Sequence, residues 1–367
     1  MNTEAAPVSP DLPPVFADWF SARGWAPRRH QLDLLAAREK GASVLLIAPT
    51  GAGKTLAGFL PSLIEIHTRG YKPATERPES PLRELMAAGD TRAALEAMRE
   101  ARKRPSRLHT LYVSPLKALA VDIARNLETP IAEMGLDIRV ETRTGDTASA
   151  RRQRQKSDPP DILLTTPEQI ALLIASKEAE ELFASLKTVV LDELHALVTS
   201  KRGDLLALGL ARLRALSSNL RTVGLSATVA DPDALRRYLV PQPREGEVLA
   251  DLVMADPGAK PDVSILASDE RVPWSGHSAR YAMPEIYGAI KQHKTTLLFV
   301  NTRSQAELLF QELWRINEDV LPIALHHGSL DVCQRRKVEK AMAENRLRAV
   351  VATSTLDLGI DWGDVDL

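Results

Sequence analysis

The sequence is poor in cysteine and has no long apolar run. A single cysteine, Cys333, among 367 residues excludes an internal disulfide and a cysteine-rich metal site, and it fits a reducing cytosol. No apolar stretch approaches the ~20 residues that a membrane-spanning helix requires. Residues 1–16 have neither the basic nor the apolar segment of a secretory signal. These absences predict a cytoplasmic protein that has no membrane partner.

The chain also lacks an excess of charge of either sign. Its 47 basic and 48 acidic side chains leave a formal net charge of −1, so total charge argues neither for nor against nucleic acid as a partner. Basic residues do cluster locally, at 101–107, 151–156 and 335–337. Such clusters are usually solvated helix faces, and they indicate binding only where other features place them beside a groove.

What the chain does have is an alternation of short apolar runs with segments that carry Leu and Ala at helical spacing. The runs predict strands within residues 43–50, 109–115, 137–145, 161–167, 186–193 and 220–228, and the intervening segments predict helices such as 116–128, 168–183 and 204–216. The alternation predicts right-handed crossovers and a mostly parallel sheet, and continuously apolar strands fit a sheet that is covered on both faces. The expected fold class is α/β.

The length of 367 residues favours two domains, each able to bury its own core. We expect a first domain over 1–240, with an insertion at about 71–107 that is rich in proline and charge. Residues 241–276 are rich in Pro, Gly and Asp, so they are the expected linker, which can also hold an edge strand or two. Strand–helix alternation resumes over 277–367 and predicts a second, incomplete α/β domain.

The strongest motif is APTGAGKT at residues 48–55, directly after the apolar run VLLI. Its glycines allow backbone N–H groups to turn inward as an anion nest at the start of a helix. Lys54 adds a charge for the β- and γ-phosphates, and Thr55 supplies a hydroxyl to Mg²⁺. Ala48 stands where the general P-loop pattern has glycine, but the Gly-x-Gly-Lys-Thr core is whole. The motif therefore predicts ATP and Mg²⁺ as cofactors, bound by Thr50, Gly51, Ala52, Gly53, Lys54 and Thr55.

A later apolar run ends in two adjacent carboxylates, in the sequence VVLDELHALV at 189–198. In a P-loop sheet, an acidic residue at the tip of a second strand holds Mg²⁺ opposite the hydroxyl of the loop, and Asp192 fits this role. Glu193 is then placed to orient and deprotonate the water that attacks the γ-phosphate. Without a cation, two neighbouring carboxylates at a buried sheet edge repel and raise each other's pKa. Taken alone, the same string also suits a helix N-terminus.

In that order APTGAGKT, DELH and SAT (226–228) resemble motifs I, II and III of superfamily 2 helicases, which clamp ATP between two RecA-like domains. Other strings are similar to motif Ia, a strand-contacting loop, and motifs Ib, IV and V, at 114–122, 144–147, 165–170, 297–307 and 352–363 respectively. As a set they look most like the large helicase-related (Lhr) family, and within it the bacterial ligase-associated DEXH-box branch. Asp357 is a mild departure, because relatives often carry Glu there.

The resemblance implies roles for individual residues. Gln31 matches a glutamine that reads adenine, and Gly359 and Asp361 would face the nucleotide from the second domain. Coupling between the nucleotide and the strand would fall to His195, Ser226, Ala227 and Thr228. The groove for a nucleic-acid backbone would be lined by Ser114, Lys117, Thr144, Gly145, Thr166 and Pro167, and the second domain would grip the same strand with Arg303, His327 and Thr353. Hydroxyls, backbone N–H groups and a lysine at loop tips suit phosphates without reading bases.

The activity that the resemblance implies is ATP-driven movement along single-stranded DNA in the 3′-to-5′ direction. Tailed duplexes would be unwound, and DNA-repair proteins would be partners. RNA or an RNA–DNA hybrid stays open as the substrate, as in an RNA helicase of the DEAD-box type. No QRxGR-like motif VI, whose arginines reach the γ-phosphate, appears before Leu367, so the sequence looks truncated before this motif. A non-catalytic ATP-dependent clamp therefore stays open, as does a motor whose partner supplies the arginines.

Overall fold

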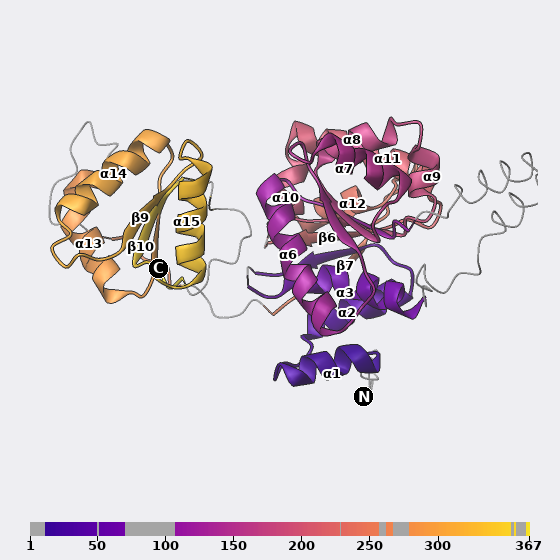
Figure 1. The fold of residues 1–367 in the computed structure, drawn as a ribbon, viewed down its shortest axis with the longest axis horizontal. Helices are drawn as coiled ribbons and strands as arrows, with labels where there is room; N and C mark the ends of the chain where they lie inside the picture. The colour runs from indigo at the N-terminus through magenta and orange to yellow at the C-terminus, as the bar shows by residue number, and fades with distance from the viewer. Residues whose placement is uncertain are drawn as a thin grey trace, which may run out of the picture. The chain divides into compact units, whose positions relative to one another are not determined.

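The computed structural model describes residues 12–49, 51–69, 107–227, 229–256, 262–266, 279–353, 356 and 365–367. The chain divides into two compact units, Met1–Gly258 and Ala259–Leu367, and Figure 1 labels many of their helices and some of their strands. Several residues singled out from the sequence lie outside the described residues, namely Thr50, Thr228, Asp357, Gly359, Asp361 and positions 71–106 of the expected insertion.

The first unit is built on a seven-stranded sheet with the order β3-β4-β2-β5-β6-β1-β7, in which every neighbouring pair is parallel. Its strands are β1 (Val44–Ile47), β2 (Thr110–Val113), β3 (Val140–Arg143), β4 (Ile162–Thr165), β5 (Thr188–Leu191), β6 (Arg221–Ser226) and β7 (Asp251–Met254). The six strands expected between residues 43 and 228 are all present, and the α/β fold class is confirmed.

Helices cover both faces of this sheet, which explains why its central strands are continuously apolar. On one face Leu45, Val113 and Leu191 share a core with α8 (Pro167–Ile174), α9 (Ala179–Phe183), α10 (Leu194–Val198), α11 (Lys201–Leu216) and α12 (Pro232–Leu239). The other helices are α1 (Pro14–Ala22), α2 (Arg29–Glu39), α3 (Lys54–Thr68), α6 (Lys117–Glu133) and α7 (Ser149–Ser157). Of these, α3 packs on the opposite face, where its Gly58 lies against Val190 and Leu225.

Residues 168–183 form two helices, where helical periodicity predicted one. α8 ends at Ile174, the N–H of Ser176 donates to the carbonyl of Leu173 at 3.1 Å, and α9 begins at Ala179. The break lets Leu173 of α8 and Leu182 of α9 reach the same core. Periodicity alone does not locate such a break, because both pieces keep the same apolar spacing.

The expected linker at 241–276 begins inside the first unit. Its residues Asp251–Met254 form β7, which pairs in parallel with β1 at the edge of the sheet. The first unit accordingly extends to Gly258, beyond the boundary at 240 that composition suggested. The strand was hard to place from sequence, because three of its four residues are exposed and its pattern is not that of a buried run.

The second unit has a three-stranded parallel sheet with the order β8-β10-β9. Its elements are η2 (Ala279–Ala282), α13 (Met283–Gln292), β8 (Thr296–Phe299), α14 (Arg303–Arg315), β9 (Ile323–His326), α15 (Val332–Ala343) and β10 (Ala349–Ala352). β10 is the central strand and is buried along its length, with Val351 facing one apolar cluster and Val350 facing another. Within the described parts of the chain, no helix combines the length and the apolar character that a membrane crossing needs.

Candidate functional site

The carboxyl ends of parallel strands meet at one edge of a sheet, so the segments that follow β1 to β6 gather along one edge of the first unit. The strand order divides that edge into two halves. β5, β6 and β1 are consecutive in the sheet and lead into the DELH, SAT and P-loop segments. β3, β4 and β2 are also consecutive, and they lead into the segments predicted to contact a nucleic-acid strand.

In the P-loop, two glycines set the backbone between β1 and α3. Gly51 and Gly53 have φ values of +76° and +74°, in the left-handed region that glycine adopts without steric cost. Gly53 is the N-cap of α3, so the free N–H groups of the first helical turn, beginning at Lys54, face the loop. This is the backbone arrangement that binds phosphate at the start of a helix.

Gln31, the predicted adenine-reading residue, lies beside this loop. It is buried in α2, and a Cβ built on Gly53 would lie 3.3 Å from its Nε2. Its Oε1 accepts a hydrogen bond of 2.9 Å from the N–H of Arg28. Arg28 also donates from Nη1 to the carbonyl of Gly51 at 3.2 Å, a contact with the P-loop that sequence reasoning missed. No pattern in the sequence marks this contact, because Arg28 and Gly51 are 23 residues apart.

The P-loop lysine and the acid pair lie in one buried cluster. Lys54 Nζ is 3.9 Å from Glu193 Oε1, and their side chains are 10% and 7% exposed. Asp192 is also buried, and the charge of Lys54 is close enough to oppose part of the rise in its pKa that burial causes. Thr55 follows Lys54 in the first turn of α3 and is half-buried. The structure thus brings together the residues that the sequence assigned to phosphate, metal and water.

Two groups hold the Asp192 carboxylate in place. The hydroxyl of Tyr112, on the neighbouring strand β2, donates to Asp192 Oδ2, and the N–H of Glu193 donates to Oδ1 at 2.9 Å. Burial and the adjacent charge of Glu193 nevertheless raise the pKa of Asp192 to about 6. Tyr112 is fully buried and stacks on Phe59. No sequence signal marks this tyrosine, because it reads as an ordinary aromatic residue in a strand.

An acid pair of this kind fits a divalent cation. Carboxylate and hydroxyl oxygens, as offered by Asp192 and Thr55, are the ligands that Mg²⁺ prefers. The elevated pKa of Asp192 reflects burial first and then the like charge of Glu193, in a site where Lys54 is the nearby cation. A bound divalent ion would remove that repulsion, so the residues present suit Mg²⁺.

Glu193 has a backbone conformation that side chains rarely adopt, with φ of +45°. This left-handed turn ends β5 and makes Glu193 the N-cap of α10, so that His195 falls in the first turn of that helix. His195 Nδ1 is 3.6 Å from Glu193 Oε2 and 3.1 Å from Ser226 Oγ. Burial, and then the charge of Lys54, lower the pKa of His195. His195 therefore connects the acid pair to Ser226 at the end of β6.

The other half of the edge carries the segments that follow β2, β4 and β3. Ser114 is buried after β2, and its Oγ accepts from the N–H of Leu116 at 3.3 Å. Lys117 Nζ is 3.0 Å from Asp146 Oδ1 and lies next to Gly145, so the segments after β2 and β3 are in contact.

Thr144 and Thr166, the two threonines predicted to line the groove, lie directly after β3 and β4. Thr144 donates its N–H to Thr147 Oγ1 at 3.0 Å, and its own Oγ1 accepts from the N–H of Asp146 at 3.3 Å. Thr166 is buried at the N-cap of α8, and Pro167 is the first residue of that helix. The structure therefore brings all six predicted groove residues to three neighbouring strand ends.

In the second unit, the predicted gripping residues also follow strand ends at one edge. Arg303 begins α14 after β8, and its Nη1 donates to Ser329 Oγ at 2.5 Å. His327 follows β9, is buried, and has its Nε2 3.3 Å from Glu307 Oε1. Thr353 follows β10, and its N–H donates to the carbonyl of His326 at 3.3 Å. All three therefore share the carboxyl edge of this sheet.

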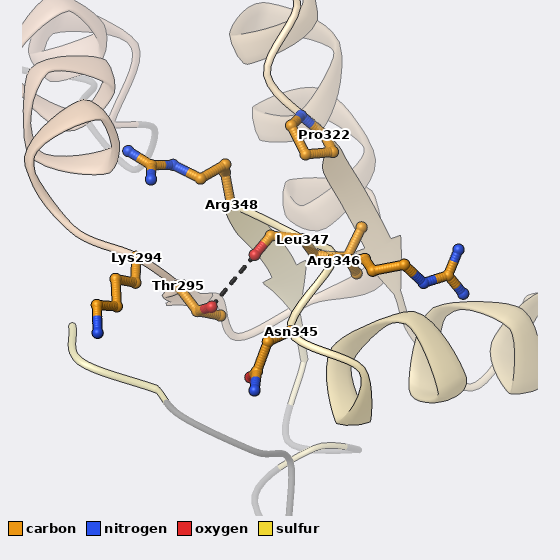
Figure 2. A pocket seen from close by; sticks show the side chains of 7 residues that line it. All are labelled: Lys294, Thr295, Pro322, Asn345, Arg346, Leu347 and Arg348. Atoms are coloured by element: carbon orange, nitrogen blue, oxygen red, sulfur yellow. Dashed lines mark hydrogen bonds between the residues drawn. The ribbon is translucent and has the colours of Figure 1, made fainter.

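A hollow of about 420 Å³ lies at the opposite, amino-terminal edge of the same sheet (Figure 2). It is lined by Lys294, Thr295, Pro322, Asn345, Arg346, Leu347 and Arg348. The dashed line in Figure 2 marks the 3.2 Å hydrogen bond from Thr295 Oγ1 to the carbonyl of Leu347, which ties two of its walls together. Because these residues precede the strands, the hollow is separate from the edge that carries Arg303, His327 and Thr353.

Comparison with known proteins agrees with the motifs. The family model for DEAD/DEAH box helicases matches residues 28–235, and the model for the helicase conserved C-terminal domain matches residues 280–367. The Lhr helicase/probable uracil glycosylase of Mycolicibacterium smegmatis is 34% identical over an alignment that covers 100% of this chain and 25% of its own length. The ATP-dependent helicase Lhr-Core of Methanocaldococcus jannaschii is 33% identical over 89% of this chain and 36% of its own length.

Among solved structures, the Mycobacterium smegmatis helicase Lhr bound to ssDNA and AMP-PNP matches with a TM-score of 0.72 and 34% identity. The match covers 97% of this chain and 43% of that chain. Across the Lhr relatives, this chain spans 25% to 40% of their length.

Proposed function

Because this chain belongs to the DEAD/DEAH box helicase family and has Lhr helicases among its relatives, we propose that it is an ATP-dependent motor acting on single-stranded DNA. One observation carries the proposal most directly. Lys54 Nζ lies 3.9 Å from Glu193 Oε1 in a buried cluster that also contains Asp192. A P-loop sheet binds a nucleoside triphosphate with a lysine at the start of a helix and with carboxylates at the end of a nearby strand. Here the lysine follows β1 and the carboxylates follow β5, with β6 between the two strands.

In this proposal the first unit binds the nucleotide with backbone and side-chain groups together. The N–H groups that follow Gly51 and Gly53 bind the phosphates, and Lys54 turns from Glu193 to the β- and γ-phosphates. Gln31, fixed by the N–H of Arg28, hydrogen-bonds the edge of adenine. Asp192 and Thr55 would hold Mg²⁺, which would neutralise charge on the phosphates when bound. Tyr112 keeps the Asp192 carboxylate oriented toward the site.

Glu193 is the proposed general base. Its carboxylate lies in the same cluster as Lys54. The left-handed backbone turn at the end of β5 sets the direction in which the Glu193 side chain leaves the main chain. It orients the attacking water and accepts its proton. His195, within hydrogen-bond distance of Ser226, passes the state of the nucleotide site to β6.

The strand-binding part of the proposal rests on the segments after β2, β3 and β4. Lys117 and the N–H and hydroxyl groups near Thr144 and Thr166 bind phosphates of the strand, and Arg303, His327 and Thr353 bind it from the second unit. Single-stranded DNA is the proposed strand because the solved Lhr helicase that this chain resembles is bound to ssDNA. Binding by such groups is insensitive to sequence and weakens steeply as salt rises.

The finer expectations are also part of the proposal. They are 3′-to-5′ movement, unwinding of tailed duplexes, a role in DNA repair with repair proteins as partners, membership of the ligase-associated branch and a cytoplasmic location. The residues outside the described ranges, Thr50, Thr228, Gly359 and Asp361, keep the roles that the family resemblance implies. Since the chain spans 25% to 40% of its Lhr relatives, the activity of a longer protein is proposed only through the residues discussed above.

The test is ATP hydrolysis by the chain with and without single-stranded DNA, together with displacement assays on tailed DNA, RNA and hybrid duplexes. We expect turnover that the DNA strand stimulates and that falls when salt weakens strand binding. Stimulation by RNA alone would instead support an RNA helicase of the DEAD-box type. ATP binding without turnover, at any strand concentration, would support a non-catalytic clamp and contradict the motor.

A further inference from the structure

One arginine at the start of α11 joins two of the segments predicted to contact the strand. Arg202 donates from Nε and Nη2 to the two carboxylate oxygens of Glu168, at 2.5 and 3.1 Å. Its third nitrogen, Nη1, donates to the carbonyl of Pro115 at 2.7 Å. Pro115 lies in the segment after β2, and Glu168 lies in the first turn of α8, after β4. A single guanidinium therefore bonds both segments at once.

The position of Arg202 is itself tightly set. Ser200 caps α11 by accepting a hydrogen bond from the N–H of Gly203, and Tyr238 donates to the Gly203 carbonyl at 2.7 Å. A Cβ on Gly203 would lie 2.3 Å from the carbonyl oxygen of Leu197, so glycine is required where α11 packs on α10. Since Glu193 is the N-cap of α10, this packing connects the acid pair to Arg202 through one short helix and one turn.

The Glu168 end of the contact reaches a predicted strand-binding residue. The hydrogen bonds from Arg202 are the largest of the effects that lower the pKa of Glu168, to about 2, and a hydrogen bond from the Thr166 side chain adds to them. Arg202 and Glu168 are 39% and 48% exposed, so the pair contributes little to overall stability. The planar contact with two hydrogen bonds nevertheless fixes the orientation of the Arg202 guanidinium relative to Glu168. The hydrogen bond to the carbonyl of Pro115 fixes the distance between that guanidinium and the segment after β2.

We propose that Arg202 is a positioning residue that holds the segments carrying Ser114, Lys117 and Thr166 at the spacing required by a nucleic-acid strand. Arg202 does not touch the strand itself; it acts through Glu168 and the carbonyl of Pro115. Arg202 stands on α11, which packs on α10, the helix that follows the acid pair. It therefore also makes that spacing responsive to the nucleotide site. This inference rests on the proposed function of the same edge of the sheet.

The decisive variant is Glu168→Gln, tested beside Arg202→Gln and Arg202→Lys. Removing a negative charge near a phosphate groove should tighten strand binding if charge alone matters. If Arg202 positions the groove through Glu168, Glu168→Gln should instead weaken single-stranded DNA binding, about 3- to 10-fold, as Arg202→Gln does. Arg202→Lys should restore little, because an ammonium cannot make the planar contact and reach the carbonyl together. The double variant should be no weaker than either single one.

The readouts separate positioning from direct contact. Strand affinity is measured by fluorescence anisotropy across a salt series, and hydrolysis is measured without strand. Loss of a direct phosphate contact would lower the slope of log affinity against log salt by about one, whereas loss of positioning should leave that slope unchanged. Hydrolysis without strand and thermal unfolding should match the wild type. Arg212→Gln, an exposed residue on the same helix, is the matched control.

The outcomes also distinguish this inference from the proposed function. If the wild-type chain binds no strand, the proposed function fails and the inference fails with it. If the wild type binds and is stimulated but Arg202→Gln and Glu168→Gln behave like Arg212→Gln, the inference alone is wrong. Tighter binding by Glu168→Gln beside weaker binding by Arg202→Gln would make Arg202 a simple surface charge and also overturn it.

Discussion

The two halves of the first unit's carboxyl edge place their polar groups in opposite environments. In the half formed by β5, β6 and β1, Asp192, Glu193 and Lys54 are charged groups withdrawn from water. In the half formed by β2, β4 and β3, Lys117 and Asp146 are exposed, and the buried groups are hydroxyls together with Arg143, which donates to the carbonyl of Arg152. The first arrangement suits chemistry on a small ligand, since charges act strongly where water is excluded. The second suits a long polyanion, which needs contacts that form and release.

This contrast has an energetic side. Burial raises the pKa of Asp192 to about 6, so the nucleotide half carries unfavourable charge in the folded protein. The exposed pair between Lys117 and Asp146, in the half formed by β2, β4 and β3, carries no such cost, because solvent screens it. In the same half Arg143, at the end of β3, is a buried charge whose pKa is lowered by burial. Substitutions in the first half should therefore change rates and stability by large factors, and those in the second should change affinity modestly.

The largest expected effect is that of Glu193→Gln, which would sharpen the contrast. Removal of the general base should lower ATP turnover about 10²- to 10³-fold, while strand affinity stays within twofold of the wild type. Steady-state hydrolysis and anisotropy measure the two quantities. Glu181→Gln, an exposed change of the same type on α9, should alter neither. Equal turnover in Glu193→Gln and wild type would remove Glu193 from the role of base.

Asp192→Asn tests whether the nucleotide half is held at a cost in stability. The pKa of Asp192 is about 6 in the folded chain against an ordinary 3.8. The protonated form is thus favoured by folding, and the stability it brings is full below about pH 4 and lost as the pH rises through 6. At pH 7.5, without nucleotide or Mg²⁺, Asp192→Asn should raise the free energy of unfolding by about 1–3 kcal/mol.

Urea unfolding at pH 7.5 and pH 4.5 measures this gain, which should shrink at the lower pH because the native aspartic acid is then already neutral. Asp137→Asn, at an exposed position, should show no such dependence on pH. A variant that is less stable than the wild type at pH 7.5 would contradict a raised pKa at Asp192.

Lys117→Gln tests the half formed by β2, β4 and β3, which is proposed to bind the nucleic-acid strand. Loss of one phosphate contact should weaken binding of single-stranded DNA about 3- to 10-fold and reduce the salt slope by about one, while ATP affinity is unchanged. Lys177→Gln, an exposed lysine in the turn between α8 and α9, is the control and should have little effect. A lower ATP affinity in Lys117→Gln would break the division of the edge into two halves.

The smallest expected effect belongs to His195→Asn, at the link between the acid pair and Ser226. We expect strand stimulation of hydrolysis to fall about 2- to 4-fold, with hydrolysis in the absence of strand little changed. Burial and the charge of Lys54 lower the pKa of His195, so its imidazole stays neutral from pH 7.5 to 9. Stimulation by wild type should therefore stay level from pH 7.5 to 9. A step within that interval that is absent from His195→Asn would contradict a neutral histidine.

Local pattern was sufficient for the strands and for the two strongest motifs. The sequence predicted β1 and β5 as apolar runs that end at a sharp turn, and both strands are buried throughout. It placed β7 only as an edge strand somewhere within 241–276, without its bounds, and it missed the break between α8 and α9. Three of the four residues of β7 are exposed, so the pairing partner β1 decides its structure rather than its own composition. The break is set by the shared core beneath Leu173 and Leu182.

The contacts that join motifs were also beyond the sequence. Arg28, Tyr112 and Arg202 each make a hydrogen bond with a group of a predicted motif, namely Gly51, Asp192 and Pro115. None of the three partners lies within twenty residues of the residue that contacts it. Residue type and spacing carry no record of such contacts, because they depend on which strands become neighbours.

The sequence by itself determined the parts of this protein: an α/β chain with a phosphate loop, an acid pair and a set of polar strand ends. Those features are local, since apolar periodicity, glycine at left-handed positions and helix starts depend on a few adjacent residues. The tertiary structure alone decided which parts meet. The strand order β3-β4-β2-β5-β6-β1-β7 places Lys54 beside Glu193 and Tyr112 beside Asp192, and it brings Arg202 between two strand ends. Burial at those meeting points then sets the charge balance of the site, because the cost of a charge depends on what surrounds it.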